Sequence, residues 1–247
     1  MYDELSAYYH LMFESWDASI ARQAAVLGPL LEQSCDGTSV QVLDAACGIG
    51  TQAIGLAFRG HQVTGSDLSA AATARARVEA VSRDLAIPFY TADVRDLSDV
   101  PGAPFGAVLM ADNAMAHLLT EDDVCRAARS IAHKLEPGGV FLASMRDYDT
   151  LARERPAFHG PAFFDDGGKR RIVHQVWDWT AEHYYTMHLH ITFETGAGWE
   201  YHHFTSAFHA IPRSMVTGAL SKAGFSMRWL EPAESGYYQP VVLARLV

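Results

Sequence analysis

Short apolar runs alternate with helical segments through residues 40–145, and this alternation limits the possible folds more than any other feature of the chain. Five runs have the length and composition of buried strands, and Ala-rich or amphipathic stretches separate most of them. Such alternation predicts βαβ units and a parallel sheet that is buried on both faces. Ligands of such sheets bind beyond the carboxyl ends of the strands. Functional residues are therefore expected where the apolar runs end.

The first apolar run leads into a turn with few side chains, VLDAACGIGTQA at 42–53. Gly48 and Gly50 allow a tight turn and a close approach of the backbone to a ligand, and the helix after them offers free N–H groups. Asp67 ends the second run about 20 residues after Gly48, where a carboxylate can accept hydrogen bonds from two ribose hydroxyls. The turn and the acid together predict a cofactor that contains adenosine.

The residues around this turn narrow the choice of cofactor. VLDAACGIGTQA resembles the first motif of class I S-adenosylmethionine-dependent methyltransferases, GSDLS the second, TADVRDL the third and LEPGGVFLAS their loop-and-strand motif. The four motifs have the order and spacing of that family over about residues 40–145. The resemblance implies a Rossmann-like α/β fold, in which helices cover both faces of a seven-stranded sheet. It also implies S-adenosylmethionine as cofactor and S-adenosylhomocysteine as product.

The same resemblance assigns roles in cofactor binding. Asp67 would bind the ribose, Asp93 would meet the adenine amino group, and Val94 would pack on the adenine ring. The residues expected to bind the cofactor are Tyr9, Trp16, Arg22, Ala46, Gly48, Asp67, Leu68, Asp93, Val94 and Ala111. Two of them have competing interpretations, because Asp93 could cap a loop and Arg22 could pair with a surface acid such as Asp17.

Three further stretches resemble glycine and sarcosine N-methyltransferases and their relatives. WDASIARQA is similar to their N-terminal helix, where an arginine meets the cofactor's carboxylate, and Arg22 is the matching residue. ADNAMAHL is similar to their fourth-strand motif and makes Asn113 and His117 the candidate catalytic residues. MRDYDTL is similar to their motif after strand five, which places Arg146 against a substrate carboxylate. A structural histidine at 117, and an ion pair of Arg146 with a neighbour such as Asp147, are the competing interpretations.

After about residue 150, apolar and polar residues alternate over longer segments. RRIVHQVWDWT, YYTMHLHITFE and EYHHFTSAFHA predict three strands of an antiparallel sheet, inserted after the fifth strand at 150–211. Many of the 12 histidines lie here, but without the pattern of a known metal site. We expect no metal, and a polar face that lines an aromatic pocket. The expected substrate-binding residues are Asn113, Arg146, Trp177, Trp179 and Tyr184.

The N-terminal residues 1–34 are expected to form a helical lid on the methyltransferase domain at 35–247. An aromatic cluster with Tyr8, Tyr9 and Trp16 precedes apolar residues at helical spacing. Aromatic ring faces stabilise cations, which suits a sulfonium. Such a lid could close over cofactor and substrate.

Composition excludes several other classes of function. The formal charge of −10 at pH 7 argues against nucleic acid as a partner, because affinity for a polyanion depends on clustered Lys and Arg. The three separated cysteines indicate neither a disulfide framework nor a zinc site, and they fit a reducing compartment. No apolar stretch approaches the roughly 20 residues that span a bilayer, and the N-terminus does not resemble a signal peptide. We expect a cytoplasmic protein without a membrane partner, which could form a homo-oligomer.

These observations lead us to expect methyl transfer from S-adenosylmethionine to a small molecule. A sulfonium methyl is already activated, so the protein must mainly align a nucleophile and exclude water. His117 would act as base where the nucleophile must lose a proton. The aromatic residues of the insert favour a nitrogen-containing aromatic acceptor, such as an indole-type heterocycle of secondary metabolism, methylated on nitrogen or carbon. N-methylation of a small amine or amino acid is the alternative, and a non-catalytic cofactor-binding protein is the alternative from another class.

Overall fold

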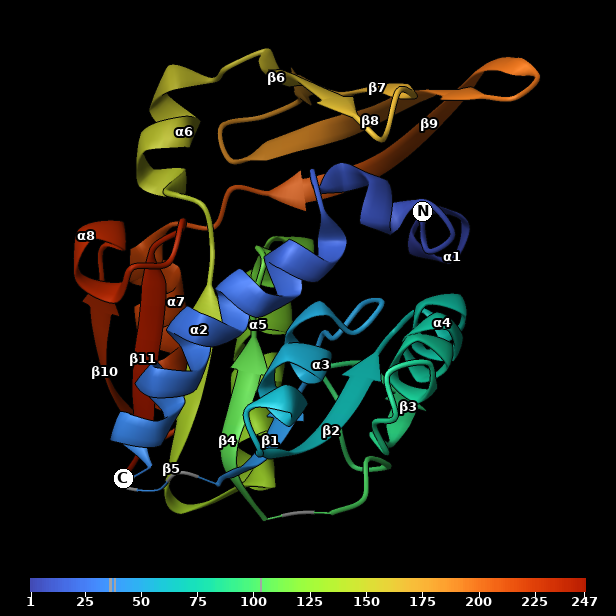
Figure 1. The fold of residues 1–247 in the computed structure, drawn as a ribbon. Coiled ribbons are helices and arrows are strands. Elements are labelled where there is room, and N and C mark those ends of the chain that lie inside the picture. The colour runs from blue at the N-terminus through green and yellow to red at the C-terminus, as the bar shows by residue number, and fades with distance from the viewer. Residues whose placement is uncertain (36, 38, 103) are drawn as a thin grey trace.

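The computed structural model describes residues 1–35, 37, 39–102 and 104–247, and two separate sheets organise them. Figure 1 shows a larger sheet with helices around it and a smaller sheet that lies above its upper edge. The N-terminal segment runs between the two sheets before it enters a long helix. This arrangement confirms the predicted Rossmann-like sheet with an inserted antiparallel sheet.

The larger sheet has seven strands, all drawn from the two parts of the sequence predicted to form it. They are β1 (Gln41–Asp44), β2 (Gln62–Asp67), β3 (Phe89–Thr91), β4 (Phe105–Met110), β5 (Leu135–Ser144), β10 (Phe225–Leu230) and β11 (Val241–Leu246). Their order is β10-β11-β5-β4-β1-β2-β3. Strands β1 to β5 are mutually parallel, whereas β11 is antiparallel to both β5 and β10. The order reverses beside β1, so β1 and β4 flank the point where ligands of such sheets bind.

Helices cover both faces of this sheet. The longer ones are α2 (Trp16–Ser34), α3 (Thr51–Phe58), α4 (Ala70–Val81), α5 (Glu121–Lys134) and α7 (Arg213–Lys222). Three begin at hydroxyl caps, because Ser15, Ser69 and Thr120 accept the backbone N–H three residues further on. Helix α5 also has acids in its first turn and bases in its last, which complements the helix dipole.

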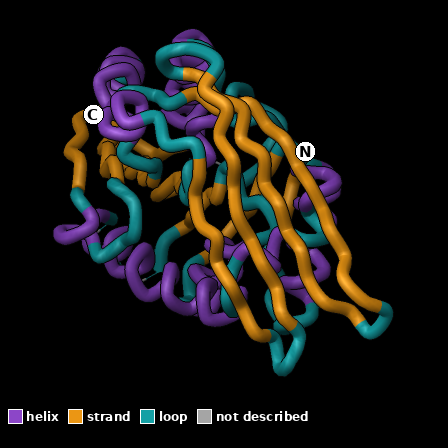
Figure 2. The backbone as a smooth tube through the Cα atoms, turned by 90° about the horizontal axis from the view of Figure 1, so that it is seen from above, coloured by secondary structure: helices purple, strands orange, loops and turns teal. Residues whose placement is uncertain are grey.

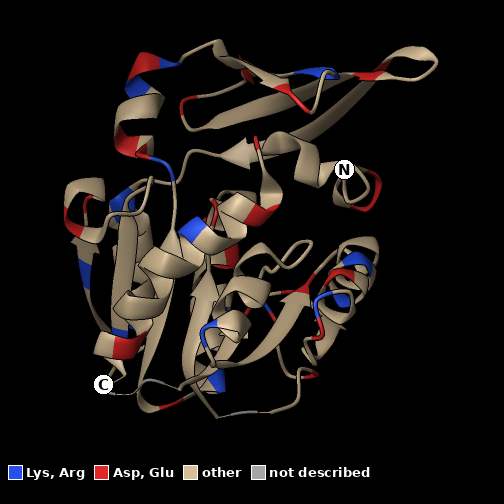
Figure 3. Ribbon diagram, viewed as in Figure 1, with Lys and Arg blue, Asp and Glu red and all other residues tan. Residues whose placement is uncertain are grey.

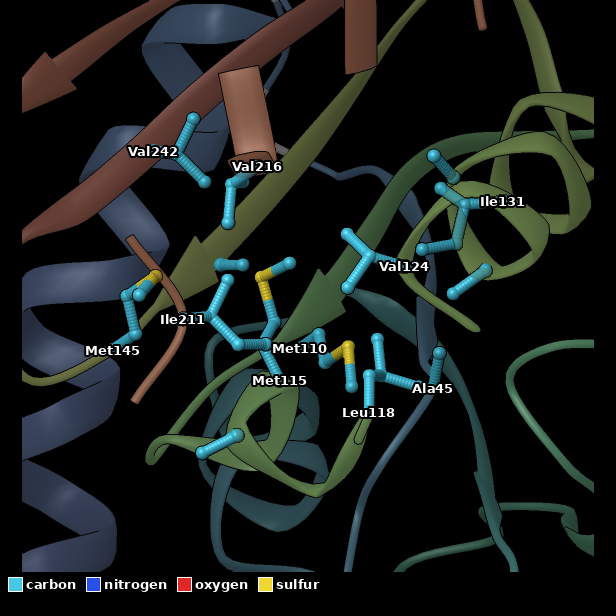
Figure 4. Close-up of a cluster of buried hydrophobic side chains, with 14 of the residues drawn as sticks. Ala45, Met110, Met115, Leu118, Val124, Ile131, Met145, Ile211, Val216 and Val242 are labelled. Atoms are coloured by element: carbon cyan, nitrogen blue, oxygen red, sulfur yellow. The ribbon is translucent and has the colours of Figure 1, made fainter. Parts of the chain in front are cut away.

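Two apolar clusters fill the spaces between the sheet and these helices. Neighbouring residues of one strand belong to opposite clusters: Val42 packs with α2 and α3, whereas Leu43 packs with α5. Figure 4 shows part of the cluster that contains Leu43. Met110 and Val124 lie there close to residues of the C-terminal part of the chain. Burial on both faces explains why the strands read as continuous apolar runs.

The smaller sheet has four antiparallel strands rather than the three predicted. They are β6 (Phe158–Asp165), β7 (Arg170–Trp179), β8 (Tyr184–Thr195) and β9 (Gly198–His209), in that order, and β6 follows the short helix α6 (Tyr148–Glu154). The additional strand β6 contains Gly160 and Pro161, which weaken a strand pattern but are tolerated on an edge strand. In β8 the predicted alternation holds, because Tyr185, Met187 and Leu189 are buried and the residues between them are not.

The predicted lid at residues 1–34 divides at Ser15. From Trp16 onward the chain forms α2, whose Leu27 and Leu31 are fully buried in the core beside α3. Helix α2 is therefore a fixed layer of the fold. Only residues 1–15, with α1 (Tyr2–Leu5) and the 3-10 helix η1 (Tyr9–Met12), lie between the two sheets. None of the helices in the described part of the chain has the length and apolar content needed to cross a membrane.

Candidate active site

A cavity of about 390 Å³ opens at the carboxyl ends of β1, β2, β3 and β4. We call it the cofactor cavity. Most of the residues predicted to bind the cofactor line it, namely Tyr9, Ala46, Gly48, Asp67, Leu68, Asp93, Val94 and Ala111. They come from separate turns that the parallel strands bring to one edge of the sheet.

The glycine turn and the acid after β2 are joined by hydrogen bonds. The Gly48 N–H donates to Asp67 Oδ2 (2.9 Å), and the Ser69 N–H donates to Asp67 Oδ1 (2.8 Å). A carboxylate oxygen has two lone-pair sites, so each keeps one for a ligand hydroxyl. Gly48 has φ +53°, and no atom lies within 4 Å of the position that a Cβ would take there. The turn therefore leaves space for close approach of a ligand.

Two further acids at this edge have pKa values shifted in opposite directions. Asp93 accepts hydrogen bonds from the Arg95 side chain (2.6 Å at the shortest) and from the Arg95 N–H (2.9 Å), and Arg95 holds the pKa of Asp93 low. Asp93 thus does cap its loop, and it also lines the cofactor cavity. Asp44, which ends β1, is fully buried, and burial raises its pKa to about 8. At neutral pH Asp44 is largely uncharged.

Trp16 and Arg22 do not lie where cofactor binding was predicted. Trp16 Nε1 donates to Thr51 Oγ1 (2.9 Å), and its ring packs under the guanidinium of Arg83. Trp16 therefore fastens α2 to α3 and does not line the cofactor cavity, which corrects its predicted role. Arg22 lines a neighbouring cavity instead. The competing ion pair with Asp17 is also absent among the described residues, because Asp17 pairs with Arg83 (2.6 Å).

A second cavity, of about 350 Å³, lies between the seven-stranded sheet and the inserted sheet. We call it the acceptor cavity. The two cavities share a wall, because several residues line both of them, among them Tyr2, Tyr9, Asp112 and His117. This wall stands at the end of β4, where η2 (Ala114–His117) begins the next connection.

His117 stands in the shared wall as a half-buried, neutral imidazole. Its Nε2 hydrogen-bonds with the Tyr2 hydroxyl (2.7 Å), and the Phe208 ring centroid is 4.4 Å from its own. Burial lowers the pKa of His117 to about 4. The uncharged imidazole has a lone pair that can accept a proton, and its lowered pKa makes it a weaker base than a solvent-exposed histidine.

Lowering the pKa of His117 makes folding stability depend on pH. Because the unfolded imidazole binds a proton near pH 6.5 and the folded one only near pH 4, stability is lost as the pH falls through this interval. Between pH 7 and pH 5 the free energy of unfolding should therefore fall more for the wild type than for His117→Gln, by at most about 2 kcal/mol in urea unfolding. Equal losses in the two proteins would show that His117 titrates normally.

Asn113 supports its neighbours rather than facing the shared wall. Its Nδ2 donates to the Tyr148 hydroxyl (2.8 Å), and its Oδ1 accepts the Arg146 N–H (3.1 Å). The residue is buried at φ +69°, in the left-handed region that Asn tolerates better than most residues. Asn113 does line the acceptor cavity, but its hydrogen bonds make it a positioning residue for Arg146.

Arg146 places a guanidinium in the acceptor cavity. Its Nη2 donates to Gln175 Oε1 (3.4 Å), and its Cζ lies 4.6 Å from the Trp177 ring centroid. Asp147 and Asp149, the competing partners, approach Arg213 instead. Within the described residues no carboxylate pairs with Arg146, so its charge is available to a ligand.

The inserted sheet turns its apolar face, not its polar face, to the acceptor cavity. Val173, Met187 and Leu189 line the cavity, because the sheet buries its apolar side against the N-terminal segment. This corrects the expectation of a polar lining. It also removes Tyr184 from the substrate-binding set, since that ring lies on the opposite face, stacked on His209 and 39% exposed.

Trp177 and Trp179 lie behind the wall of the acceptor cavity. Trp177 is buried under Arg146 and donates from Nε1 to Gln175 Oε1 (2.9 Å). Trp179 donates from Nε1 to the carbonyl of Pro156 (3.0 Å). Neither ring lines the cavity, which corrects the prediction that both contact the substrate. Trp177 supports Arg146 instead, and Trp179 supports the inserted sheet.

Sequence reasoning missed a carboxylate that lines both cavities. Asp112 accepts hydrogen bonds from Gln52 (2.8 Å), Gln23 (3.2 Å), and the hydroxyls of Tyr237 and Tyr238 (2.5 Å each). All four donors are uncharged, so the charge of Asp112 is not neutralised by them. Two features of the sequence could have indicated Asp112. It directly precedes Asn113, and the pair Tyr237-Tyr238 before the last strand supplies two hydroxyl donors.

Residues 1–15 contribute Tyr2 and Tyr9 to the walls of both cavities and are held by several contacts. Ser69 Oγ donates to Asp3 Oδ1 (2.5 Å), and the Tyr8 ring lies 3.8 Å from the His202 ring. Buried Arg171 donates to the backbone carbonyls of Leu11 and Phe13, and thereby ties this segment to β7. Arg171 is therefore a structural residue.

The contacts of Arg171 predict how the lid responds to substitution. Arg171→Met should raise hydrogen exchange of residues 1–15 at least tenfold, because about two charge-assisted hydrogen bonds are lost. S-adenosylhomocysteine should restore part of the protection. Arg170→Met, a change at the exposed neighbour that pairs with Glu194, is the control and should leave this exchange unchanged. Equal exchange in both variants, with and without S-adenosylhomocysteine, would contradict a lid.

The cofactor cavity lies at the carboxyl ends of the parallel strands, beside Asp67 at the end of β2, which is the position that the resemblance to class I methyltransferases predicted. Residues 42–139 match the family model described as a methyltransferase domain. This part of the chain is therefore similar to a methyltransferase domain, as its motifs predicted.

Several known proteins are similar to this chain. The putative methyltransferase YqeM of Bacillus subtilis is 30% identical over 63% of this chain and 57% of its own length. Glycine N-methyltransferase of Rattus norvegicus is 31% identical over 52% of this chain and 46% of its own length. The chain thus spans about half the length of these curated relatives. The sugar N-methyltransferase KedS8 from Streptoalloteichus shares the fold, with a TM-score of 0.78 at 21% identity over 96% of this chain and 92% of that one.

Proposed function

We propose that this chain transfers a methyl group from S-adenosylmethionine to a small molecule, on nitrogen or on an electron-rich carbon. The observation that carries the proposal is the shared wall between the two cavities. One cavity has the residues for an adenosine-containing cofactor, and the other has an apolar floor and an unpaired guanidinium. His117 and Asp112 stand between them, where donor and acceptor would meet.

The residues of the cofactor cavity fit S-adenosylmethionine. Asp67 keeps lone pairs for the ribose hydroxyls, and the open space beside Gly48 admits the cofactor. Leu68 is 67% exposed although apolar, and with Val94 it offers side walls for a flat base. Asp112 suits the positive charge that this cofactor carries. When bound, the cofactor supplies a methyl group that needs no further activation.

The residues of the chain then have three tasks. Arg146 and the apolar floor orient the acceptor, which can contribute several kcal/mol of the roughly 7–11 kcal/mol available from alignment. Neutral His117 accepts the proton that an acceptor nitrogen releases, and Tyr2 holds the imidazole by its hydrogen bond. Residues 1–15 exclude water from both cavities.

The apolar floor of the acceptor cavity favours an acceptor with a flat aromatic body. An indole-type ring, methylated on nitrogen or on an electron-rich carbon, is an example. Met187, Leu189 and Phe208 form an apolar surface beneath the space that Arg146 and His117 border. A ring buries more apolar area there than glycine could, and each good ring–ring contact adds about 0.5–1.5 kcal/mol.

An amine of an amino acid or amino sugar is the second candidate, and the similar proteins favour it. Glycine N-methyltransferase and a sugar N-methyltransferase are both similar to this chain. Such an acceptor must be uncharged to attack the methyl group, and a buried site stabilises the uncharged form. Arg146 could then hold a carboxylate or a ring hydroxyl.

A parallel assay of S-adenosylhomocysteine release tests these proposals. It offers simple indoles, histidine, glycine, sarcosine and an amino sugar to the wild type and to His117→Gln. Turnover of indoles supports the aromatic acceptor, whereas turnover of glycine or the amino sugar without any ring compound overturns it. Cofactor binding without turnover of any acceptor would support the non-catalytic alternative. A cytoplasmic location is a further proposal, which rests on the spacing of the cysteines.

A further inference from the structure

We propose that Asp112 binds the α-ammonium group of the methionine part of the cofactor, and that Tyr238 covers this carboxylate until the cofactor arrives. The inference rests on the proposed function, because it assigns a binding residue to the cofactor named there. Asp112 follows the end of β4 by two residues and lines both cavities. It was not among the residues that the sequence motifs predicted.

Four uncharged donors hold the carboxylate of Asp112. Gln23 and Gln52 donate from their side-chain amides to Oδ2 (3.2 and 2.8 Å). Tyr237 and Tyr238 donate from their hydroxyls to Oδ1 (2.5 Å each). These contacts occupy the lone-pair sites of both oxygens without neutralising the charge. A carboxylate that keeps its charge in a cavity favours a cationic ligand.

The cluster around Asp112 has more acceptors than hydrogen atoms to fill them. The Tyr237 hydroxyl lies 2.5 Å from Asp112 Oδ1 and 2.6 Å from Gln23 Oε1. With Asp112 ionised, both of these oxygens can only accept, and the hydroxyl has one hydrogen to donate. Burial and the charge of Asp112 raise the pKa of Tyr237, so its hydroxyl keeps that hydrogen. An ammonium group has three N–H donors and no acceptor, which is the chemistry that the cluster lacks.

Tyr238 is the donor that can leave Asp112. Tyr237 is 2% exposed and contacts two acceptors, whereas Tyr238 is 58% exposed. Tyr238 lies in the connection between α8 (Pro232–Ser235) and β11. Figure 2, seen from above, shows the C-terminal end of the chain beside the inserted sheet and not beneath it. The Tyr238 ring can therefore turn outward and free one lone pair of Oδ1, while Tyr237 stays in place.

The backbone fixes Asp112 independently of these side-chain donors. The Asp112 N–H donates to Ser144 Oγ (2.8 Å), and the Asn113 N–H donates to the Ser144 carbonyl (3.1 Å). Ser144 ends β5 and is fully buried. Asp112 has φ +54°, in the left-handed region that Asp tolerates better than most residues. An exchange of Tyr238 for a ligand thus requires no movement of the backbone at Asp112.

The charge of Asp112 decides between the two possible sources of an ammonium group. A nearby negative charge stabilises the protonated form of an amine. An acceptor amine must be uncharged to attack the methyl group, so binding to Asp112 would oppose its reaction. The α-amino group of the cofactor takes no part in the transfer and can stay charged. We therefore assign the contact to the cofactor.

The charge of the surroundings acts in the same direction. The chain carries −10, and Figure 3 shows acidic residues on helices and loops around the larger sheet. Arg95, which lines the cofactor cavity, pairs with Asp93 and Asp123 (2.6 and 2.8 Å) and does not compensate Asp112. The summed field therefore favours a positive group at the shared wall.

Calorimetry with S-adenosylhomocysteine and its deamino analogue tests the ammonium contact. The analogue keeps the adenosine, the sulfur and the carboxylate, and it lacks only the ammonium group. The wild type should bind S-adenosylhomocysteine about 10- to 100-fold more tightly than the analogue, because a hydrogen bond between charged groups is absent in the latter. Asp112→Asn should remove most of this difference by weakening the binding of S-adenosylhomocysteine alone.

Tyr238→Phe tests the exchange at Oδ1. The variant lacks the hydroxyl that competes with the ligand, so it should bind S-adenosylhomocysteine about 2- to 10-fold more tightly than the wild type. Its affinity for the analogue should be unchanged. Tyr201→Phe is the matched control, because Tyr201 is also 58% exposed and its hydroxyl contacts His190 of the inserted sheet. Thermal unfolding without ligand confirms that each variant is folded.

Four outcomes would overturn the inference. A wild type that binds both ligands equally makes no ammonium contact, although the proposed function stands. An equal loss of both ligands in Asp112→Asn would make Asp112 a structural residue. Weaker binding of S-adenosylhomocysteine in Tyr238→Phe would contradict the displacement of Tyr238. A wild type that binds neither ligand would contradict the proposed function together with this inference.

Discussion

Asp67→Ala should lower the affinity for S-adenosylhomocysteine by a factor of about 10 to 100. The substitution removes the carboxylate that would accept the ribose hydroxyls, and it leaves the N–H groups of Gly48 and Ser69 without their acceptor. A hydrogen bond to a charged group contributes about 1.5–3 kcal/mol, and each 1.4 kcal/mol changes a dissociation constant about tenfold. The turn also loses the contact that fixes it against β2.

Isothermal calorimetry with three variants separates these contributions. Asp67→Asn keeps one acceptor oxygen and should lose less affinity than Asp67→Ala. Asp96→Ala is the matched control, because Asp96 is an exposed acid in the loop after β3 that does not line the cofactor cavity. Thermal unfolding without ligand checks that the turn remains folded. Affinities of all three variants within twofold of the wild type would show that Asp67 does not bind the ribose.

Arg146→Met should separate the two kinds of acceptor. An acceptor with a carboxylate should lose about 10- to 100-fold in kcat/KM, because a charge-assisted hydrogen bond of about 1.5–3 kcal/mol is removed. A neutral ring should lose only a few-fold, because methionine retains the apolar contact with Trp177. The basis for this difference is that no carboxylate among the described residues pairs with Arg146.

Initial rates with both kinds of acceptor measure this effect. Arg153→Met is the control, since Arg153 is an exposed arginine of α6 that contacts Thr150 and lines neither cavity. S-adenosylhomocysteine affinity should be unchanged in both variants. A reduced cofactor affinity in Arg146→Met would move this arginine from the acceptor cavity to the cofactor cavity.

The parts of the site that follow strand ends could be predicted from the sequence. Gly48, Asp67 and Asp93 each follow a short strand, and parallel pairing brings those strand ends to one edge. The position of such a residue in the fold is thus set by its own few neighbours. The same reasoning explains why the parallel pairing of strands β1 to β5 could be predicted from the alternation of apolar runs and helices.

The parts that depend on distant contacts could not be predicted. Trp16 was predicted to contact the cofactor because it belongs to the aromatic N-terminal cluster. Its actual direction is set by its hydrogen bond to Thr51 of α3. Tyr184 lies on the polar face of β8 by the predicted alternation, but only the packing of the sheet decides which of its two faces is turned to the acceptor cavity. Asp112 gathers its donors from three separate segments of the chain, which no local pattern encodes.

Parallel calorimetric titrations of the wild-type chain with S-adenosylhomocysteine and with NAD test the central claim most directly. Both ligands contain adenosine and both suit a glycine turn followed by an acid. The account predicts saturable one-to-one binding of S-adenosylhomocysteine and no detectable binding of NAD at the same concentration. Tight binding of NAD without binding of S-adenosylhomocysteine would contradict it.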